Sequence, residues 1–260
     1  MILKENREYW TGRASGYSEV NRTELATAQR QRWRDCLCAE IMRNFPGRGA
    51  ENLRVLEVGT GPGFFAIILA EGGYPVTAVD LTPAMLEEAK KNAGELAGRI
   101  NFMEMNAEDL EFPNGSFDVV ISRNLTWNLP RPDKAYVEWA RVLKPGGLLL
   151  NFDANWYAYL FDDEARDAYE RDRVISAEQG VGDQNIGEHF DVMEDIARRV
   201  PLSGIRRPEW DLEELKGLGL HAQADKEIWR RVWSDEEKLN FASTPMFMVS
   251  AVRPFADQNA

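Results

Sequence analysis

The sequence has little cysteine and no long hydrophobic run. Its two cysteines, Cys36 and Cys38, have no second Cys or His pair near them, so we expect reduced thiols and no metal site. No apolar run approaches the roughly 18 residues of a membrane span. The residues after Met1 turn charged at once and lack the apolar core of a secretory signal. These absences predict a cytoplasmic protein with no membrane partner.

Positive charge is also scarce. There are 31 Lys and Arg residues against 43 Asp and Glu residues, which gives a net charge of −12. Proteins that bind nucleic acids usually present a basic face, because neutralising phosphates supplies much of their affinity. We therefore expect no nucleic-acid partner. The hydrophobic share of 44% is typical of a globular protein. The chain is also long enough to bury a core without disulfides.

The pattern of apolar residues divides the chain into segments. Residues 1–50 have helical spacing at Leu37, Ile41 and Phe45 and end at Pro46-Gly47. Helical patterns then start near Phe64, Pro83 and Asp133, and another covers 212–218. Between and after them we expect seven short strands: Val55–Val58, Val76–Val79, Ile100–Met105, Val119–Ile121, Leu148–Phe152, His221–Trp229 and Pro245–Val252. Such alternation predicts an α/β protein with a mainly parallel sheet and helices on both of its faces.

One stretch interrupts this alternation. Residues 155–208 lose the strand rhythm, are rich in charge and show helical spacing at Val192, Ile196 and Val200. We therefore expect one α/β domain made of residues 51–154 and 209–260, with a helical insertion after the fifth strand. The N-terminal segment 1–50 and the insertion 155–208 are predicted to form a lid over the substrate. A dimerisation arm is the alternative for the insertion, so a homodimer is left open.

The most informative segment is a glycine loop after the first strand. Gly59, Gly61 and Gly63 alternate directly after Val55–Val58, and a helix follows. Glycine permits positive φ and a close approach of the backbone to a ligand. Asp80 ends the second strand, where an acid can accept hydrogen bonds from both hydroxyls of a ribose. The alternative is that the glycines only form a tight turn and that Asp80 is a solvated strand end. The glycine loop and Asp80 together favour a nucleoside-containing ligand.

The spacing of the glycines separates two kinds of nucleoside cofactor. A dinucleotide site uses G-x-G-x-x-G, with the third glycine where this chain has Phe64. Glu57 would also lie badly beside a pyrophosphate, whereas it suits a cationic amino acid group. A nicotinamide-dependent oxidoreductase is therefore disfavoured.

Five motifs in the same order resemble the class I S-adenosylmethionine-dependent methyltransferases, in particular those acting on small molecules. They are 57–63 (EVGTGPG), 79–86 (VDLTPAML), 106–110 (NAEDL), 117–122 (FDVVIS) and 141–147 (RVLKPGG). The resemblance implies a Rossmann-like fold and S-adenosyl-L-methionine as the cofactor. It implies that the cofactor is bound by Glu57, Gly59, Thr60, Gly61, Gly63, Asp80, Leu81, Met85, Asn106, Ala107, Glu108 and Arg123.

Two positions depart from that family. Asn106 replaces a frequent Asp, although its amide oxygen can still accept from the adenine amino group. Trp127-Asn128 stands where many relatives have a histidine, so a familiar candidate base is missing. Methyl transfer needs a base only when the acceptor is protonated, because positioning supplies much of the acceleration. No catalytic residue is therefore assigned, and the candidates are His189, Tyr17, Trp156 and Tyr157.

These features support a methyltransferase that transfers a methyl group from S-adenosylmethionine to an O, N or S atom of a small molecule. The alternative is a non-enzymatic S-adenosylmethionine-binding regulator or partner subunit. The exocyclic-amine type is disfavoured, because 122–127 lack its Pro-Pro-aromatic motif. The cysteine-dependent type is disfavoured because both cysteines precede the core, and the metal-dependent catechol type because no acidic cluster follows strands four and six.

Overall fold

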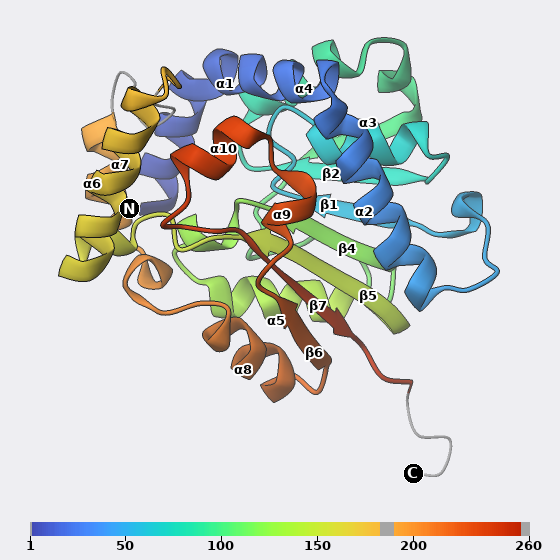
Figure 1. Ribbon diagram of the computed structural model, residues 1–260. Coiled ribbons are helices and arrows are strands. Elements are labelled where there is room, and N and C mark those ends of the chain that lie inside the picture. The colour runs from blue at the N-terminus through green and yellow to red at the C-terminus, as the bar shows by residue number, and fades with distance from the viewer. Residues whose placement is uncertain (1, 183–189, 256–260) are drawn as a thin grey trace.

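The computed structural model describes residues 2–182 and 190–255. Its centre is a seven-stranded sheet of order β3-β2-β1-β4-β5-β7-β6, in which β7 runs antiparallel to β5 and β6 and the other pairings are parallel (Figure 1). The strands are β1 (Val55–Val58), β2 (Val76–Asp80), β3 (Ile100–Glu104), β4 (Phe117–Arg123), β5 (Leu143–Asp153), β6 (His221–Asp225) and β7 (Phe247–Val252). The predicted α/β fold is confirmed.

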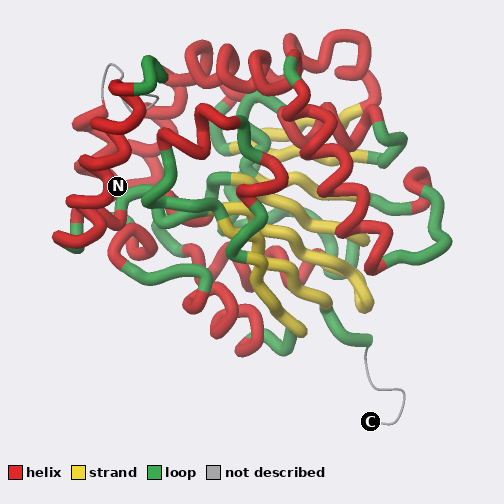
Figure 2. The backbone as a smooth tube through the Cα atoms, viewed as in Figure 1, coloured by secondary structure: helices red, strands yellow, loops and turns green. Residues whose placement is uncertain are grey.

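Helices cover both faces of the sheet (Figure 2). Those of the α/β core are α2 (Ala28–Asn44), α3 (Phe64–Glu71), α4 (Pro83–Ala93), α5 (Pro132–Val142), α8 (Glu209–Gly217), α9 (Trp229–Val232) and α10 (Asp235–Asn240). Two hydrophobic clusters fill the layers. One joins α2 and α3 to the sheet through Trp33, Phe65 and Phe152, and the other joins α5 and α8 through Trp139 and Leu215. Because both faces are covered, β1 is buried along its whole length and β4 is buried from Phe117 to Ser122.

The sixth strand is shorter than predicted, and this prediction was wrong at its C-terminal end. β6 stops at Asp225, whose carboxylate accepts from the backbone N–H of Glu227 at 2.8 Å and so forms a turn. Ile228, Val232 and Trp233 then follow at helical spacing and are buried in the first cluster. The last two residues of the predicted strand therefore lie outside it, because Ile228 is the N-cap of α9 and Trp229 is the first residue of that helix.

The N-terminal segment consists of two helices with different surroundings. α2 packs into the core through Leu37, Ile41 and Phe45, as their spacing predicted. The preceding helix, α1 (Ile2–Ala26), lies across the edge of the sheet and contacts α4 and α7 (Figure 1). Only one apolar residue of α1, Ala14, is buried. The other buried residues of α1 are polar, whereas its Ile2, Tyr9 and Trp10 are partly buried against apolar residues outside the helix.

The insertion is helical, as predicted. It contains α6 (Asp163–Glu178) and α7 (Phe190–Ala197) between β5 and α8. A third small cluster joins α7 to α1 and to the turn after β4 through Met193, Ile196, Trp10 and Trp127. Arg199, just after α7, pairs with Glu5 of α1 at 2.5 Å. The insertion and the N-terminal helix therefore meet at one end of the sheet.

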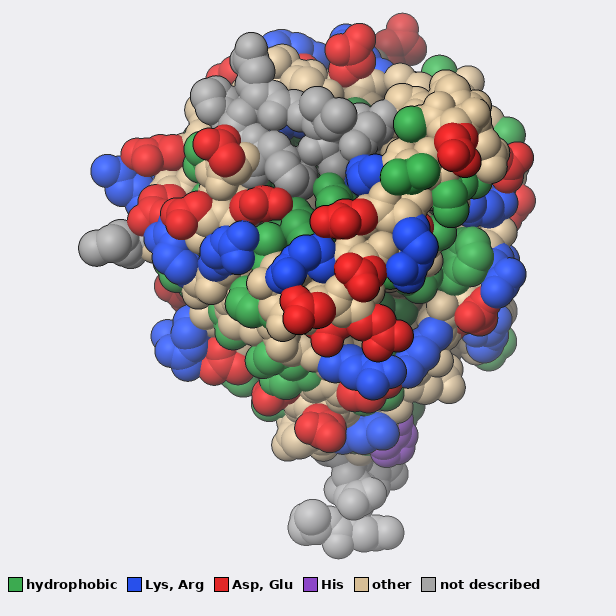
Figure 3. Space-filling model, turned by 60° about the vertical axis from the view of Figure 1, so that its left-hand side comes forward, with side chains coloured by type: hydrophobic (Ala, Val, Ile, Leu, Met, Phe, Trp, Pro, Cys, Tyr) green, Lys and Arg blue, Asp and Glu red, His purple; other side chains and the backbone are tan. Residues whose placement is uncertain are grey.

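The surface carries charges of both signs. On the face shown in Figure 3, basic and acidic side chains alternate, so the net charge of −12 is not gathered into one patch there. Within residues 2–182 and 190–255, no helix combines the length and hydrophobicity needed to cross a bilayer.

Candidate active site

A pocket lies at the carboxyl ends of β1 to β4, under α1. The sheet and its loops contribute Glu57, Gly59, Thr60, Gly61, Phe64, Phe65, Asp80, Leu81, Thr82, Met85, Met105, Asn106, Ala107, Arg123, Asn124, Leu125, Asn128 and Leu129. The helix α1 contributes Leu3, Asn6, Arg7, Trp10, Tyr17 and Asn21. Ligands of open α/β sheets bind at this edge.

The three glycines of the loop have positive φ values and separate tasks. A Cβ on Gly59 would lie 2.6 Å from Leu125, and one on Gly63 would lie 3.0 Å from Ala89 of α4. These two glycines let neighbouring elements approach the loop. A Cβ on Gly61 would meet nothing closer than the Tyr17 ring, at 3.6 Å, and Gly61 lines the pocket. The absence of a side chain at Gly61 thus leaves space for a ligand in the pocket, as a bound cofactor would require.

Asp80 organises the loop from the end of β2. Its carboxylate accepts from the backbone N–H groups of Gly61 and Thr82, each at 2.8 Å. Burial raises the pKa of Asp80, and these hydrogen bonds oppose that rise. Each carboxylate oxygen has a further lone pair, so the group retains acceptors for a ribose while it holds the loop.

Glu57 lies buried beneath the loop. Its side chain accepts from the Thr60 hydroxyl at 2.6 Å. Desolvation raises the pKa of Glu57 to about 7, against the opposing effects of that hydrogen bond and of Arg123. A carboxyl poised there ionises more readily when a cation binds beside it, as the amino group of a methionine moiety would.

Arg123 forms the floor of the pocket on the side of α1. Its guanidinium makes two hydrogen bonds to the carboxylate of Glu24 in α1, at 2.9 and 2.8 Å, and stacks 4.4 Å from the centre of the Phe64 ring. The paired carboxylate raises the pKa of Arg123 although burial lowers it. The residue lines the pocket, but its charge is engaged by the protein itself.

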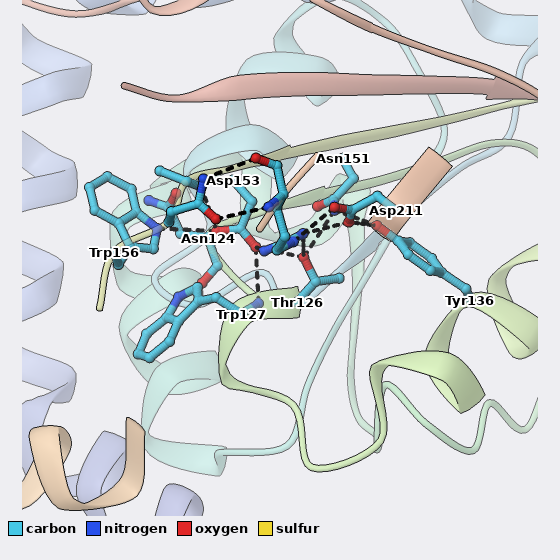
Figure 4. Close-up of polar contacts among 11 residues, drawn as sticks. Asn124, Thr126, Trp127, Tyr136, Asn151, Asp153, Trp156 and Asp211 are labelled. Carbon is cyan, nitrogen blue, oxygen red and sulfur yellow. Dashed lines mark hydrogen bonds and ion pairs between the residues drawn. The ribbon is translucent and has the colours of Figure 1, made fainter. Parts of the chain in front are cut away.

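Beside the pocket, a buried polar network holds the turn after β4 (Figure 4). Arg207, at the end of the insertion, donates to Asp153 at 2.7 Å, to Thr126 at 2.6 Å and to both oxygens of Asp211. Tyr136 also donates to Asp211. Asp153 further accepts from the backbone N–H of Trp127 at 3.0 Å. The side chains of Arg207, Asp153 and Asp211 are wholly buried.

This network fixes the geometry of the turn that ends at the pocket. Thr126 and Trp127 are held by Asp153, and Asn128, the next residue, lines the pocket. The backbone oxygen of Asn128 accepts from the side-chain amide of Asn6 in α1 at 2.8 Å. The insertion, the turn after β4 and α1 are therefore linked by a continuous series of contacts.

The predicted cofactor residues mostly come together in this pocket. Two lie outside its lining. Gly63 packs against α4, and Glu108 accepts from the backbone N–H of Arg131 at 2.7 Å. Asn106 lines the pocket, and its side-chain oxygen also accepts from the backbone N–H of Glu108 at 3.1 Å.

The catalytic candidates differ in whether they line the pocket. Tyr17 lines the pocket. Trp156 donates to Asp153 at 3.1 Å and packs against Phe241, and Tyr157 stacks beside Trp127, so both lie outside the lining. His189 lies outside the described residues. Among the residues that the structure describes, no group of three or more His, Cys, Asp or Glu side chains is arranged to hold a metal.

The sequence-based reasoning expected the N-terminal segment to cover the site and named Tyr17, but it did not single out Leu3, Asn6, Arg7 and Asn21 of α1. The pocket residues of α1 follow the helical spacing of three and four, at positions 3, 6, 7, 10, 17 and 21. They mix polar and apolar side chains, so they do not stand out in the sequence as a core-facing surface. Asn124 and Asn128 were given no role, because after the fourth strand the reasoning looked for a histidine base and found Trp127-Asn128 instead.

Comparisons with known proteins agree with this geometry. Residues 56–151 match a family model described as a methyltransferase domain. A ubiquinone/menaquinone biosynthesis C-methyltransferase UbiE from Methylobacterium nodulans is 36% identical over 141 residues, which cover 53% of this chain and 54% of that protein. The chain thus spans about half the length of the curated relatives it matches.

Solved structures share the fold over a longer stretch. A Haloferax volcanii methyltransferase, solved in complex with the Trm112 methyltransferase activator, has a TM-score of 0.59 at 17% identity and covers 94% of this chain and 97% of its own. Phosphoethanolamine N-methyltransferase 2 from Haemonchus contortus, solved with S-adenosyl-L-methionine, has a TM-score of 0.55 at 21% identity, with 83% and 52% covered. The matched domain, residues 56–151, and its motif order identify a methyltransferase domain of the class I type, whose cofactor is S-adenosylmethionine, and the solved structures share its fold.

Proposed function

We propose that this chain transfers a methyl group from S-adenosylmethionine to a small-molecule acceptor bound beneath α1. The observation that carries the proposal is the single pocket in which the glycine loop, Asp80, Asn106 and the turn after β4 converge. Those elements follow four different strands, and each matches the position that the family resemblance implied. A concave pocket of mixed polarity suits an organic molecule better than a polymer.

Within this proposal, each wall of the pocket holds one part of the cofactor. Asp80 accepts from the ribose hydroxyls, and Leu81 and Met85 pack against the adenine, whose edge meets Asn106 and Ala107. The loop at Gly59–Gly61 and the carboxyl of Glu57 lie beside the methionine moiety. The methyl group then points toward the residues that follow β4, and the acceptor binds there.

The helix α1 and the insertion act as the lid of this site. If α1 opens, polar contacts such as Arg123–Glu24 and Asn6–Asn128 separate, together with the apolar contacts of Ile2, Tyr9 and Trp10. α2 lies in the core, so the proposed lid within residues 1–50 is narrowed to α1. A closed lid would exclude water from the transfer.

Hydrogen exchange with and without S-adenosylhomocysteine tests this lid, since protection should appear in residues 2–26 and in 155–208. Protection of the insertion that depends only on protein concentration would instead indicate dimerisation.

The acceptor atom is O, N or S in this proposal. The matched UbiE proteins are named as C-methyltransferases of ubiquinone and menaquinone biosynthesis, so carbon next to a phenolic hydroxyl belongs among the acceptors to be tested. Among the catalytic candidates that the structure describes, Tyr17 is the one that lines the pocket, and it is proposed to contact the acceptor or the methionine moiety.

The function is tested by incubating the protein with S-adenosylmethionine carrying an isotopically labelled methyl group and a metabolite extract. Mass spectrometry should then detect a labelled small molecule, and the Gly61→Val variant should produce none. Binding of S-adenosylmethionine without any labelled product across extracts and phenolic quinone precursors would favour a non-enzymatic regulator. Binding of NAD alone would contradict the proposal.

A further inference from the structure

The segment after β3 carries hydrogen-bond donors in the wall of the pocket. It consists of Asn106 and Ala107, which both line the pocket and which we call the purine edge. Within residues 2–182 and 190–255, neither the side-chain amide nitrogen of Asn106 nor the backbone N–H of Ala107 donates to any group. Asn106 is half-buried, and its amide nitrogen keeps accessible surface, so it is open to a ligand. Ala107 is buried, and because buried backbone N–H groups are almost always paired, its N–H indicates a ligand that accepts.

The oxygens of the purine edge, in contrast, already accept hydrogen bonds within the protein. The side-chain oxygen of Asn106 accepts from the backbone N–H of Glu108 at 3.1 Å, and its backbone oxygen accepts from Asp109 at 3.1 Å. The backbone oxygen of Ala107 accepts from the ring nitrogen of Trp139 at 3.1 Å. The N–H of Glu108 requires an oxygen, so the amide of Asn106 can have only one orientation, with its nitrogen away from Glu108. The edge is therefore rich in donors, although each oxygen keeps a second lone pair.

These donors match one atom of adenine better than the other. On the edge of the ring that carries both, N1 accepts a hydrogen bond and the 6-amino group donates one. A free backbone N–H, such as that of Ala107, suits N1. The amide of Asn106 carries a donor and an acceptor, so it can meet either kind of group at position 6. A carboxylate at the same place could only accept, and it would therefore require the amino group.

We propose that the purine edge recognises the adenine of the cofactor through its ring nitrogen N1, and that it also binds purines that lack the 6-amino group. This inference rests on the proposed function, because it takes the adenine to lie beside Asn106 and Ala107. The N–H of Ala107 donates to N1, whereas Asn106 excludes neither a donor nor an acceptor at position 6. Leu81 and Met85, which pack against the ring, are apolar and do not distinguish these groups. The specificity of the site for its cofactor thus depends on N1 and not on the amino group.

Two analogues of S-adenosylhomocysteine separate these contacts. The 6-deamino analogue lacks the amino group and keeps N1, and the 1-deaza analogue has C–H in place of N1 and keeps the amino group. Calorimetry gives the dissociation constants of all three ligands for the wild type and for Asn106→Asp. The carboxylate of this variant can still accept from the N–H of Glu108, but it offers no donor. Asn101→Asp, at an exposed position of β3 outside the pocket, adds the same charge and is the matched control.

The wild type should bind the 6-deamino analogue within about threefold of S-adenosylhomocysteine, because less than one hydrogen bond is lost. It should bind the 1-deaza analogue about tenfold more weakly, because the N–H of Ala107 is left facing a C–H group. Asn106→Asp should prefer S-adenosylhomocysteine over the 6-deamino analogue by about tenfold, since the amino group then donates to a carboxylate. Asn101→Asp should keep the ratios of the wild type. Thermal unfolding confirms that both variants are folded.

Three results would overturn the inference while leaving the proposed function intact. Loss of more than about threefold in the affinity of the wild type for the 6-deamino analogue would show that the site requires the amino group. Equal binding of the 1-deaza analogue and S-adenosylhomocysteine would show that no donor of the edge meets N1. The same ratio in Asn106→Asp as in the wild type would show that Asn106 does not face position 6. If the wild type binds none of the three ligands, the proposed function itself fails, and this inference fails with it.

Discussion

Arg207 is the residue whose loss should damage the fold most, although it lies outside the pocket. Its guanidinium is fully buried between Asp153 and Asp211. In Arg207→Met, Asp153 keeps four donors, from Thr126, Trp127, Ala154 and Trp156. Asp211 keeps only the Tyr136 hydroxyl. A buried carboxylate is therefore left with a single partner.

The expected cost follows from that imbalance. Removing one partner of a buried ion pair destabilises a protein by about 3–5 kcal/mol, because the remaining charge has lost its compensation. This cost is a large fraction of the total free energy of unfolding of a typical protein, which is about 5–15 kcal/mol. Arg207→Met should thus lower the free energy of unfolding by about 3–5 kcal/mol. It should also weaken binding of S-adenosylhomocysteine, since the network holds the turn that leads to Asn128.

Urea unfolding followed by circular dichroism measures this effect. Arg206→Met is the matched control, because it is the same substitution one residue away at an exposed position, and it should change stability by less than about 0.5 kcal/mol. The double variant Arg207→Met/Asp211→Asn should lose less than the sum of the two single variants, because it removes the uncompensated charge. If Arg207→Met costs no more than Arg206→Met, the network does not stabilise the fold in the way described.

Three further predictions concern the pocket. Asp80→Ala should weaken S-adenosylhomocysteine roughly 30- to 150-fold, as expected for losing about 2–3 kcal/mol of charge-assisted hydrogen bonds, and calorimetry showing unchanged affinity would remove the ribose assignment. Gly61→Val should abolish that binding and lower the melting temperature modestly, because the side chain enters the pocket and φ is +52°; persistent binding would place the cofactor elsewhere. The pKa of Glu57 is raised from 4.5 to about 7 in the folded protein, so the folded state binds this proton more tightly, and its contribution to stability, present below about pH 4.5, is lost as pH rises through 7. Glu57→Gln should remove that slope from urea unfolding measured across this range, and an identical slope in the variant would contradict the assignment.

The sequence by itself determined the α/β core and predicted most of the pocket residues that follow its strands. Short strands such as Val55–Val58 are recognisable because a strand buried on both faces is mainly apolar, and Glu57 is the polar exception at the site. The glycine loop and Asp80 could be found because each depends on local chemistry: backbone that needs positive φ, and an acid at the end of a strand. Such features lie within a few residues of one another, so the linear order preserves them. The sixth strand was predicted too long, because the apolar residues Ile228 and Trp229 fit either a strand or a helix until their neighbours are known.

Only the tertiary structure decided what surrounds the cofactor residues. Asn6 and Asn128 are 122 positions apart, and Arg207 meets Asp153 across 54 positions. No periodicity links such residues, because their proximity results from how α1 and the insertion pack on the sheet. The same packing separated α2, which is buried in the core, from α1, which covers the pocket, although both belong to one helical stretch of the sequence. Local chemistry thus fixes the glycine loop and Asp80, whereas contacts between distant segments complete the pocket around them.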